Sequence, residues 1–361
     1  MKKHPYLGLP DHQFWKKSFG DGFIGGLDPV SSTRFMISRE DQVVAAGSCF
    51  AQHVARHIQK RGYNFLQTER AHPIFVKRKW DDAHGGTFNY DTFSARYGNI
   101  YTARQLRQLI DRAYGDFKPI SDSWQRSDGM FVDPFRPQVE PDGFVSAAEV
   151  RFDREYHLRA VRKALEEADV FVFTMGLTET WVDKRDGAVF PVAPGVAGGV
   201  YAPDIHEFTN FGLTETVEDM TYAIERIRSV NPDVRVLLTV SPVPLNATYE
   251  ARHVLQSTVY SKSVLRVAAQ HLFDTLPYVD YFPSFEIITA PQNGGKYFAN
   301  DMRSIEEVGV EHVMGVFFAH YAVGGAEEAQ PEVKLAANAA RQAEMERLVD
   351  VLCDEEAIDN T

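Results

Sequence analysis

The residues with the clearest chemical potential are a serine and a cysteine that lie side by side, Ser48 and Cys49. A thiol at a helix N-terminus favours its thiolate form, because free N–H groups and the positive end of the helix dipole stabilise negative charge there. The same N–H groups can hold an oxyanion. The pair therefore indicates nucleophilic attack on a carbonyl, unless Cys49 is only a small buried apolar residue and Ser48 only a helix N-cap.

The neighbouring residues are expected to place this pair at the end of a strand. Residues 42–46 form a short apolar run typical of a buried strand, and Gly47 allows a tight turn after it. Phe50, Val54 and Ile58 then repeat at intervals of four, which predicts a helix. Because ligands bind outside the carboxyl ends of the strands in an open parallel sheet, the turn is a candidate site.

Further along the chain, predicted helices alternate with apolar strands. The pairs are helix 153–168 with strand 170–175, helix 217–230 with strand 234–240, and helix 263–272 with strand 279–282, before a last core helix at 306–321. Such alternation predicts parallel βαβ units with right-handed crossovers. The expected fold is a three-layer α/β/α sandwich around a mostly parallel sheet of about five strands.

The alternation also suggests how the chain is divided. Residues 1–40 are expected to form an N-terminal arm laid over the core, and residues 41–322 the main domain. An insertion at about 63–150, with a helix near 102–114, is expected to cap the carboxyl ends of the strands, and 183–215 is read as a second irregular stretch. Residues 323–361 are expected to be a linker and a C-terminal helix near 332–352, which can dock on the core or pair two copies in a homo-oligomer.

Composition excludes several classes of function. The net charge of −12 disfavours nucleic-acid binding, and there is no basic stripe. The two cysteines do not make a disulfide framework, and neither an export signal nor a membrane span is found, so a cytoplasmic location is expected. No cofactor and no metal is expected, because the glycines at 195–199 lack a phosphate-loop lysine, and His53 and His57 lack a third ligand.

Residues 46–51 contain, letter for letter, the Gly-Ser-Cys-Phe-Ala motif of the GSCFA family. Five later segments are also similar to family blocks, at 96–101, 175–181, 239–243, 260–263 and 281–286. From about residue 40 to residue 320 the chain thus resembles the GSCFA family, a relative of the SGNH/GDSL hydrolases. The resemblance implies an SGNH-like α/β sandwich.

In that superfamily, a nucleophilic serine follows Gly-Asp at a strand-to-helix turn. The resemblance therefore implies Cys49 as the nucleophile, with Ser48 as the second choice. It also implies an oxyanion hole, to which Gly98 would contribute its N–H, with Asn99 adjacent. Thr178 takes the place of the superfamily's other donor, an asparagine, and its hydroxyl can donate over a shorter reach.

The general base is where the chain departs from the superfamily. The closing Asp-x-x-His motif is present here as Asp301 with Ser304 in the histidine position, and serine cannot act as a base near neutral pH. His253, aided by Asp301 or Glu179, is the preferred substitute, since it follows a predicted strand in a loop that can fold over the strand ends. Alternatively, His253 is an ordinary polar residue of the loop with no catalytic role. Glu179 is either a base or orienting group, or a solvated acid or helix cap.

Two functions follow from the resemblance. The first is an ester hydrolase or O-acyltransferase acting on a small molecule or a glycan, with an acylated glycan or its precursor as the expected substrate. The second is a catalytically impaired relative that keeps a carbohydrate- or peptide-binding cleft, which Ser304 favours. A cysteine of low pKa needs a base less than a serine does, because part of it is already ionised. The enzymatic alternative therefore stays open.

Overall fold

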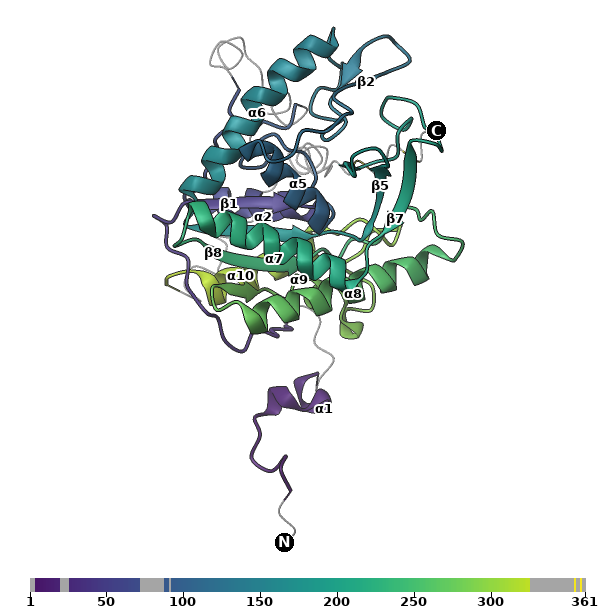
Figure 1. The fold of residues 1–361 in the computed structure, drawn as a ribbon. Coiled ribbons are helices and arrows are strands. Elements are labelled where there is room, and N and C mark those ends of the chain that lie inside the picture. Colours follow the sequence, from purple (N-terminus) through teal and green to yellow (C-terminus); the bar gives the residue numbers. More distant parts are fainter. Residues whose placement is uncertain are drawn as a thin grey trace, which may run out of the picture.

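The computed structural model describes residues 4–19, 26–71, 88–90 and 92–324, together with Asp354 and Ile358. Its main sheet has four parallel strands in the order β1-β4-β8-β9 (Figure 1). The strands are β1 (Val43–Gly47), β4 (Val170–Met175), β8 (Arg235–Val240) and β9 (Val279–Tyr281). These positions confirm the four strands that the apolar runs predicted.

The expected fifth strand is reduced, within the described residues, to a single parallel bridge between Phe65 and Val43. Val43 donates its N–H to the carbonyl of Asn64 and accepts from the N–H of Leu66, both at 2.9 Å. The chain then leaves the edge of β1: the next backbone N–H that is bonded, that of Thr68, donates to the carbonyl of Ser94 and not to β1.

Helices cover both faces of the sheet, which confirms the three-layer sandwich (Figure 1). One face packs against α5 (Ala103–Tyr114), α6 (Ala147–Glu167), α7 (Leu213–Val230) and α8 (Val254–Thr275). The other packs against α2 (Phe50–Lys60), α9 (Ser284–Thr289) and α10 (Glu307–Tyr321). Alternation along β1 explains the division: Val44 and Ala46 face the first group, Val43 and Ala45 the second.

The connections place a topological switch point at β1. From β1 the chain passes through α2 on one face to the bridge at residues 64–66, on the outer side of β1. It then crosses through α5 and α6 on the opposite face to β4, on the inner side of β1. The space outside the carboxyl ends of two such strands is where open α/β sheets bind ligands.

The start of α5 is fixed by a capping box that also holds the residue before it. The Thr102 hydroxyl accepts from the N–H of Gln105 at 3.1 Å, and the Gln105 side chain accepts from the N–H of Thr102 at 2.9 Å. The same Gln105 oxygen accepts from the N–H of Tyr101 at 2.9 Å. Tyr101 is therefore held in place at the edge of the candidate site.

The insertion contains a short ribbon of β2 (Trp124–Gln125) and β3 (Phe131–Val132). It is tied to α6 by buried ion pairs: Asp133 accepts from Arg136 at 3.0 Å and from Arg154 at 2.8 Å, and Arg136 also contacts Asp153. The helix expected near 102–114 is α5, which confirms that prediction.

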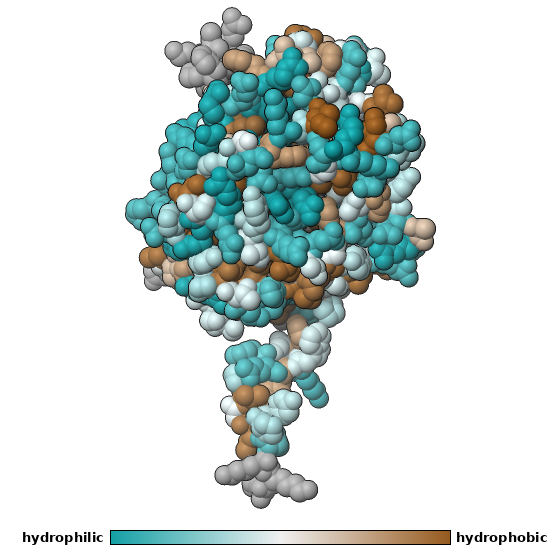
Figure 2. All heavy atoms as spheres, viewed as in Figure 1, coloured by the Kyte–Doolittle hydropathy of each residue, from teal (hydrophilic) through white to brown (hydrophobic). Residues whose placement is uncertain are grey.

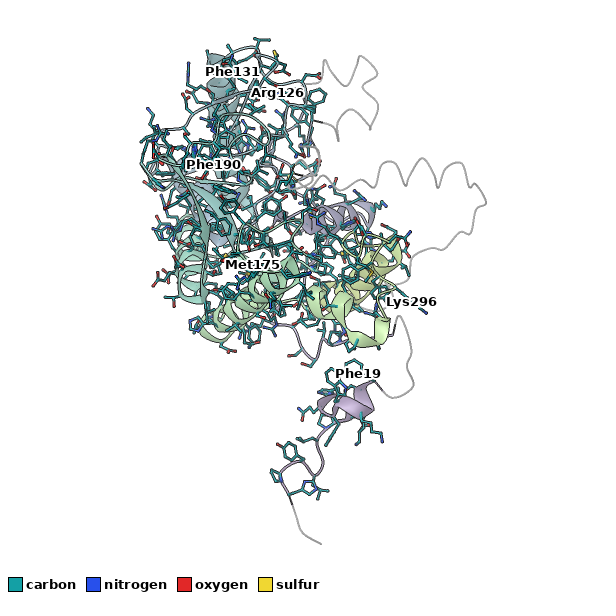
Figure 3. The ribbon with its side chains drawn as sticks, turned by 90° about the vertical axis from the view of Figure 1, so that its right-hand side faces the viewer. Phe19, Arg126, Phe131, Met175, Phe190 and Lys296 are labelled. Atoms are coloured by element: carbon teal, nitrogen blue, oxygen red, sulfur yellow. The ribbon has the colours of Figure 1, made fainter. Side chains whose placement is uncertain are left out.

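A second, three-stranded antiparallel sheet follows β4, in the order β6-β5-β7. Its strands are β5 (Glu179–Asp183), β6 (Val189–Phe190) and β7 (His206–Asn210). The prediction of an irregular stretch at 183–215 was therefore wrong in part, because two strands occur within it. In Figure 3, Phe190 of β6 and Lys296, which precedes α10, lie on opposite sides of Met175. The small sheet therefore lies away from the α10 end of the molecule.

The N-terminal residues are only partly laid over the core. Arg34 donates its N–H to Asp280 at 2.7 Å and Ile37 donates to the carbonyl of Tyr321 at 2.6 Å. In contrast, the 3-10 helix Asp11–Gln13 and α1 (Trp15–Ser18) bury no residue. Figure 2 shows this segment projecting below the main body, whose visible face is mainly hydrophilic with apolar residues in scattered patches.

Near the end of the described region, a 3-10 helix, Pro291–Asn293, precedes α10. The helix expected near 332–352 lies outside the described residues, so its pairing with another copy stays a prediction. Of the helices that the structure describes, none combines the length and apolar character that crossing a membrane requires.

Candidate functional site

A glycine turn at the end of β1 brings two strands into close backbone contact. Gly47 has φ 138°, a conformation that side chains rarely adopt, and pairs with Thr174 of β4. A Cβ at Gly47 would lie 2.7 Å from the backbone N of Thr174 and 2.9 Å from its carbonyl carbon. Directly after the turn, the N–H of Ser48 donates to the carbonyl of Thr174 at 3.0 Å.

The turn places Cys49 at the N-terminus of α2, as its position in the sequence predicted. Cys49 is a free thiol, 3% exposed, and immediately precedes the first residue of the helix. The side chain of Ser48 does not cap the helix: its buried Oγ has no hydrogen-bond partner among the described residues. Two nucleophilic side chains are thus buried at one turn.

The segment with Gly98 and Asn99 is bonded to this turn. The N–H of Ile100 donates to the carbonyl of Gly47 at 2.8 Å. The Asn99 side chain accepts a hydrogen bond from Gln52, in the first turn of α2, at 3.1 Å. The structure therefore brings the turn with Cys49 and the segment with Gly98 and Asn99 together.

Gly176 closes the opposite side of the turn. A Cβ there would lie 2.9 Å from the Ser48 Cβ and 3.1 Å from the carbonyl oxygen of Tyr101, so a side chain would separate the two segments. The N–H of Gly176 donates to that same carbonyl at 3.0 Å. Ser48, Tyr101 and Gly176 are consequently packed against one another.

Thr178 has partners of its own. Its hydroxyl donates to the side-chain oxygen of Asn210 at 2.7 Å, and its N–H donates to the hydroxyl of Ser261 at 3.0 Å. The Asn210 amide in turn donates to Glu250 at 2.9 Å. The resemblance had implied that the Thr178 hydroxyl donates to an oxyanion. In the structure the hydroxyl donates to Asn210 instead.

Glu179 begins β5 and is half-buried. It accepts a hydrogen bond from the hydroxyl of Thr248 at 2.7 Å. Burial raises the pKa of Glu179, and the hydrogen bond from Thr248 offsets part of that rise. A carboxyl group with a raised pKa can carry a proton closer to neutral pH than a solvated one.

The other predicted proton carriers lie at the surface. His253 is exposed and is the N-cap of α8, where its Nδ1 accepts from the N–H of Leu255 at 3.1 Å. The next residue, Val254, packs against Tyr101 and Leu177, which places His253 at the rim of the site. Asp301 is exposed and accepts from the hydroxyl of Ser304 at 2.6 Å.

Sequence reasoning missed a buried lysine in the site. Lys262, on α8, is 3% exposed, and its Nζ donates to the carbonyl of Gly176 at 2.6 Å. A lysine within the apolar face of α8 was a signal that could have identified it, since lysine is rarely buried without a role. Gln52 and Tyr101 were also missed, because nothing in their spacing marks their contacts.

His53, one turn after Cys49 on α2, gives a testable pH dependence. Burial, with a smaller effect of Arg56, lowers the pKa of His53 from 6.5 to about 3. Below pH 6.5 the unfolded chain therefore binds a proton here that the folded chain does not. The free energy of unfolding should fall by about 1.4 kcal/mol per pH unit from this group as the pH drops from about 6.5 towards 3, and be constant above 6.5.

Urea unfolding at pH 7.5 and 5.5 measures this contribution in the wild type and in His53→Leu. We expect the loss between the two pH values to be smaller by about 1.4 kcal/mol in the variant. His271→Leu, at an exposed position of α8, is the control and should keep the wild-type loss. An unchanged pH dependence in His53→Leu would show that His53 is protonated in the folded chain.

The fold and the turn together define an α/β/α protein with adjacent buried serine and cysteine side chains at the switch point of its sheet. The model of the GSCFA family matches residues 42–317, most of the chain, and the chain belongs to that family. Neither the curated proteins nor the solved structures contain a match. Within the described residues, no group of three or more histidine, cysteine, aspartate or glutamate side chains could hold a metal ion.

Proposed function

We propose that the protein cleaves or transfers acyl esters through a covalent intermediate on Cys49. The Cys49 thiolate attacks the acyl carbonyl, a carbon–sulfur bond forms, and the ester C–O bond breaks as the leaving alcohol takes a proton from a rim group, His253 or Glu179, which recovers it from the second attacking hydroxyl. Water or a second hydroxyl then attacks the thioester, which releases the acid or the new ester and regenerates the thiolate.

One arrangement carries the proposal: the Cys49 turn and the Gly98–Asn99 segment are bonded to each other at the switch point. The links are the Ile100–Gly47 backbone bond and the Gln52–Asn99 side-chain bond. An acyl carbonyl attacked by Cys49 would develop its negative charge beside the Gly98 N–H and the Asn99 amide. Fixed donors of this kind are a large source of catalysis in acyl transfer.

Proton transfer is assigned to groups around the rim. His253, beside the packed Val254, can take the proton of the second attacking hydroxyl, and Glu179 can assist with its raised pKa. The buried ammonium of Lys262 donates to the carbonyl of Gly176 and so helps to hold the residue that packs against Ser48. Asp301 is proposed only as a support of its own turn, since its bonds go to Arg303 and Ser304.

The substrate class is proposed from the family resemblance: an O-acylated glycan or its precursor, with water or a sugar hydroxyl as the acceptor. A cytoplasmic location and pairing of two copies through the C-terminal segment belong to the same proposal. Exposed aromatic residues near β5, such as Tyr249 packed on Trp181 at 4.9 Å between ring centroids, offer a surface on which a sugar ring can stack.

Intact mass after brief exposure to p-nitrophenyl acetate tests the proposal, with the adduct mapped by peptide digestion. We expect a transient increase of one acetyl group on Cys49 that decays as product accumulates. An adduct on Ser48 would move the nucleophile by one residue. A protein that acquires no adduct on either residue across pH 6 to 9 would contradict acyl-enzyme chemistry.

A carbohydrate- or peptide-binding function without catalysis is the second candidate. It is favoured by the bond from the Ser304 hydroxyl to Asp301, because the aspartate of the Asp-x-x-Ser turn is bonded to the serine that stands in the histidine position. Binding of acylated oligosaccharides with no loss of the acyl group would support it over the first.

A further inference from the structure

The carboxylate of Asp354 lies inside the candidate site, although it is 255 residues further along the chain than its partner Asn99. Asp354 is only 4% exposed. Its carboxylate accepts from the Asn99 side-chain amide at 3.1 Å, and its backbone N–H donates to the Tyr101 hydroxyl at 2.9 Å. Two site residues thus hold one residue of the C-terminal segment by both its side chain and its backbone.

The Asn99 carboxamide links this carboxylate to the nucleophile's helix. Its oxygen accepts from Gln52, three residues after Cys49, while its NH2 group donates to Asp354. The amide orientation is therefore fixed by α2, and it presents its donor to the C-terminal segment. An amide donor held in this way suits an acceptor that carries negative charge.

Asp354 lies beside a small cavity. The cavity is lined by Gly98, Asn99 and the buried Arg136, with the remaining wall from Asn89, Gln138 and Val139. A buried carboxylate is costly unless it is hydrogen-bonded and near positive charge. The charge of Arg136 is already shared by Asp133 and Asp153, so the Asn99 amide is the group that holds the Asp354 carboxylate.

We propose that Asn99 and Tyr101 form a carboxylate-binding site that Asp354 occupies in the resting chain, and that a free carboxylate ligand must displace Asp354 to approach Cys49. Because Asp354 belongs to the same chain, its effective concentration is on the order of millimolar or higher, so that weak free carboxylates compete only in that range. The inference uses the position of Cys49 and not its reactivity towards esters.

Hydrogen exchange of the peptide that contains Asp354 tests the occupancy in the full-length protein. Asn99→Asp sets one carboxylate against another, and we expect exchange of this peptide to rise about tenfold or more. Combining Asn99→Asp with Asp354→Asn reverses donor and acceptor and should restore the protection. Asp204→Asn, at an exposed position, is the control and should leave it unchanged.

Added acetate tests the binding of a free carboxylate. In the wild type, acetate at tens of millimolar should raise exchange of the Asp354 peptide relative to chloride at the same ionic strength, as expected for competition with a tethered group. In Asp354→Ala, acetate should instead raise the thermal midpoint, because the vacated site binds it. Equal effects of acetate and chloride would overturn the carboxylate site.

Alkylation of Cys49 by iodoacetamide, mapped by digestion, tests whether Asp354 blocks access. We expect a rate about tenfold higher in Asp354→Ala and in Asn99→Asp, and the wild-type rate in the double variant. Unchanged exchange in Asn99→Asp, or an unchanged alkylation rate in both single variants, would overturn the proposal. Neither measurement depends on ester cleavage, so a failure here is distinct from a failure of the acyl-enzyme function.

Discussion

Replacing Cys49 by alanine is expected to lower the rate of ester cleavage by about 10³-fold or more, because no other side chain at the turn supplies a thiolate. Cys49 is 3% exposed at the first turn of α2, beside the Gly98–Asn99 segment. The measurement is pre-steady-state release of p-nitrophenol, with the ester in excess, by the wild type and by Cys49→Ala. Release of about one equivalent in a fast first phase of the wild-type reaction should be absent from the variant.

Two further variants make this result specific. Cys353→Ser removes the other thiol of the chain and should keep the fast first phase, because the proposal places the acyl group on Cys49. Ser48→Ala should keep the first phase, because Ser48 is the second choice of nucleophile. If Ser48→Ala loses the first phase and Cys49→Ala retains it, the roles of the two residues are reversed.

The layers of the fold could be predicted because they depend on short-range patterns. The apolar run at 42–46 and the four-residue spacing of Phe50, Val54 and Ile58 correspond to β1 and α2 within one or two residues. The fifth strand could not be placed, since its one bridge, at Phe65, depends on where the chain leaves the sheet. The short strand β6 is hidden for a similar reason: two residues are too few to show alternation.

The candidate site was predictable only where a motif marked it. Cys49 and Gly98 were indicated by the resemblance, and the bonds of Ile100 and Asn99 to the turn connect their segments. The contacts of Lys262 and Asp354 were not, because each joins residues that are far apart in the chain and leaves no periodic signal. The alternative role of Ser48, a helix N-cap, is excluded because its hydroxyl makes no hydrogen bond to the start of α2.

The position of the turn at a switch point explains why backbone geometry and chemistry are coupled here. Gly47 and Thr174 are partners in the register of β1 and β4, at the carboxyl ends of the two strands. The residues that follow each strand, Ser48 and Gly176, therefore face each other. Any change that separates the two strand ends also moves Ser48 relative to Gly176. Stability and site geometry should therefore be lost together at Gly47.

Gly47→Ala is accordingly expected to destabilise the fold by about 4 kcal/mol, the sum of a strained φ and an overpacked contact. The new Cβ would meet the backbone of Thr174, which cannot rotate away as a side chain can. Urea unfolding of the two proteins measures the difference. Gly187→Ala is the matched control: its φ of 78° is also unfavourable for a side chain, but the space around it is open.

The control gives the cost of a positive φ where the space is open. Gly187→Ala should cost about 1 kcal/mol, so the excess in Gly47→Ala measures the contact with Thr174 together with the additional strain of the φ of 138°. Equal losses would mean that the strand ends can separate without further cost. In that case the turn would be held by the helix contacts of α2, and Cys49 would keep its position relative to Asn99 in the variant.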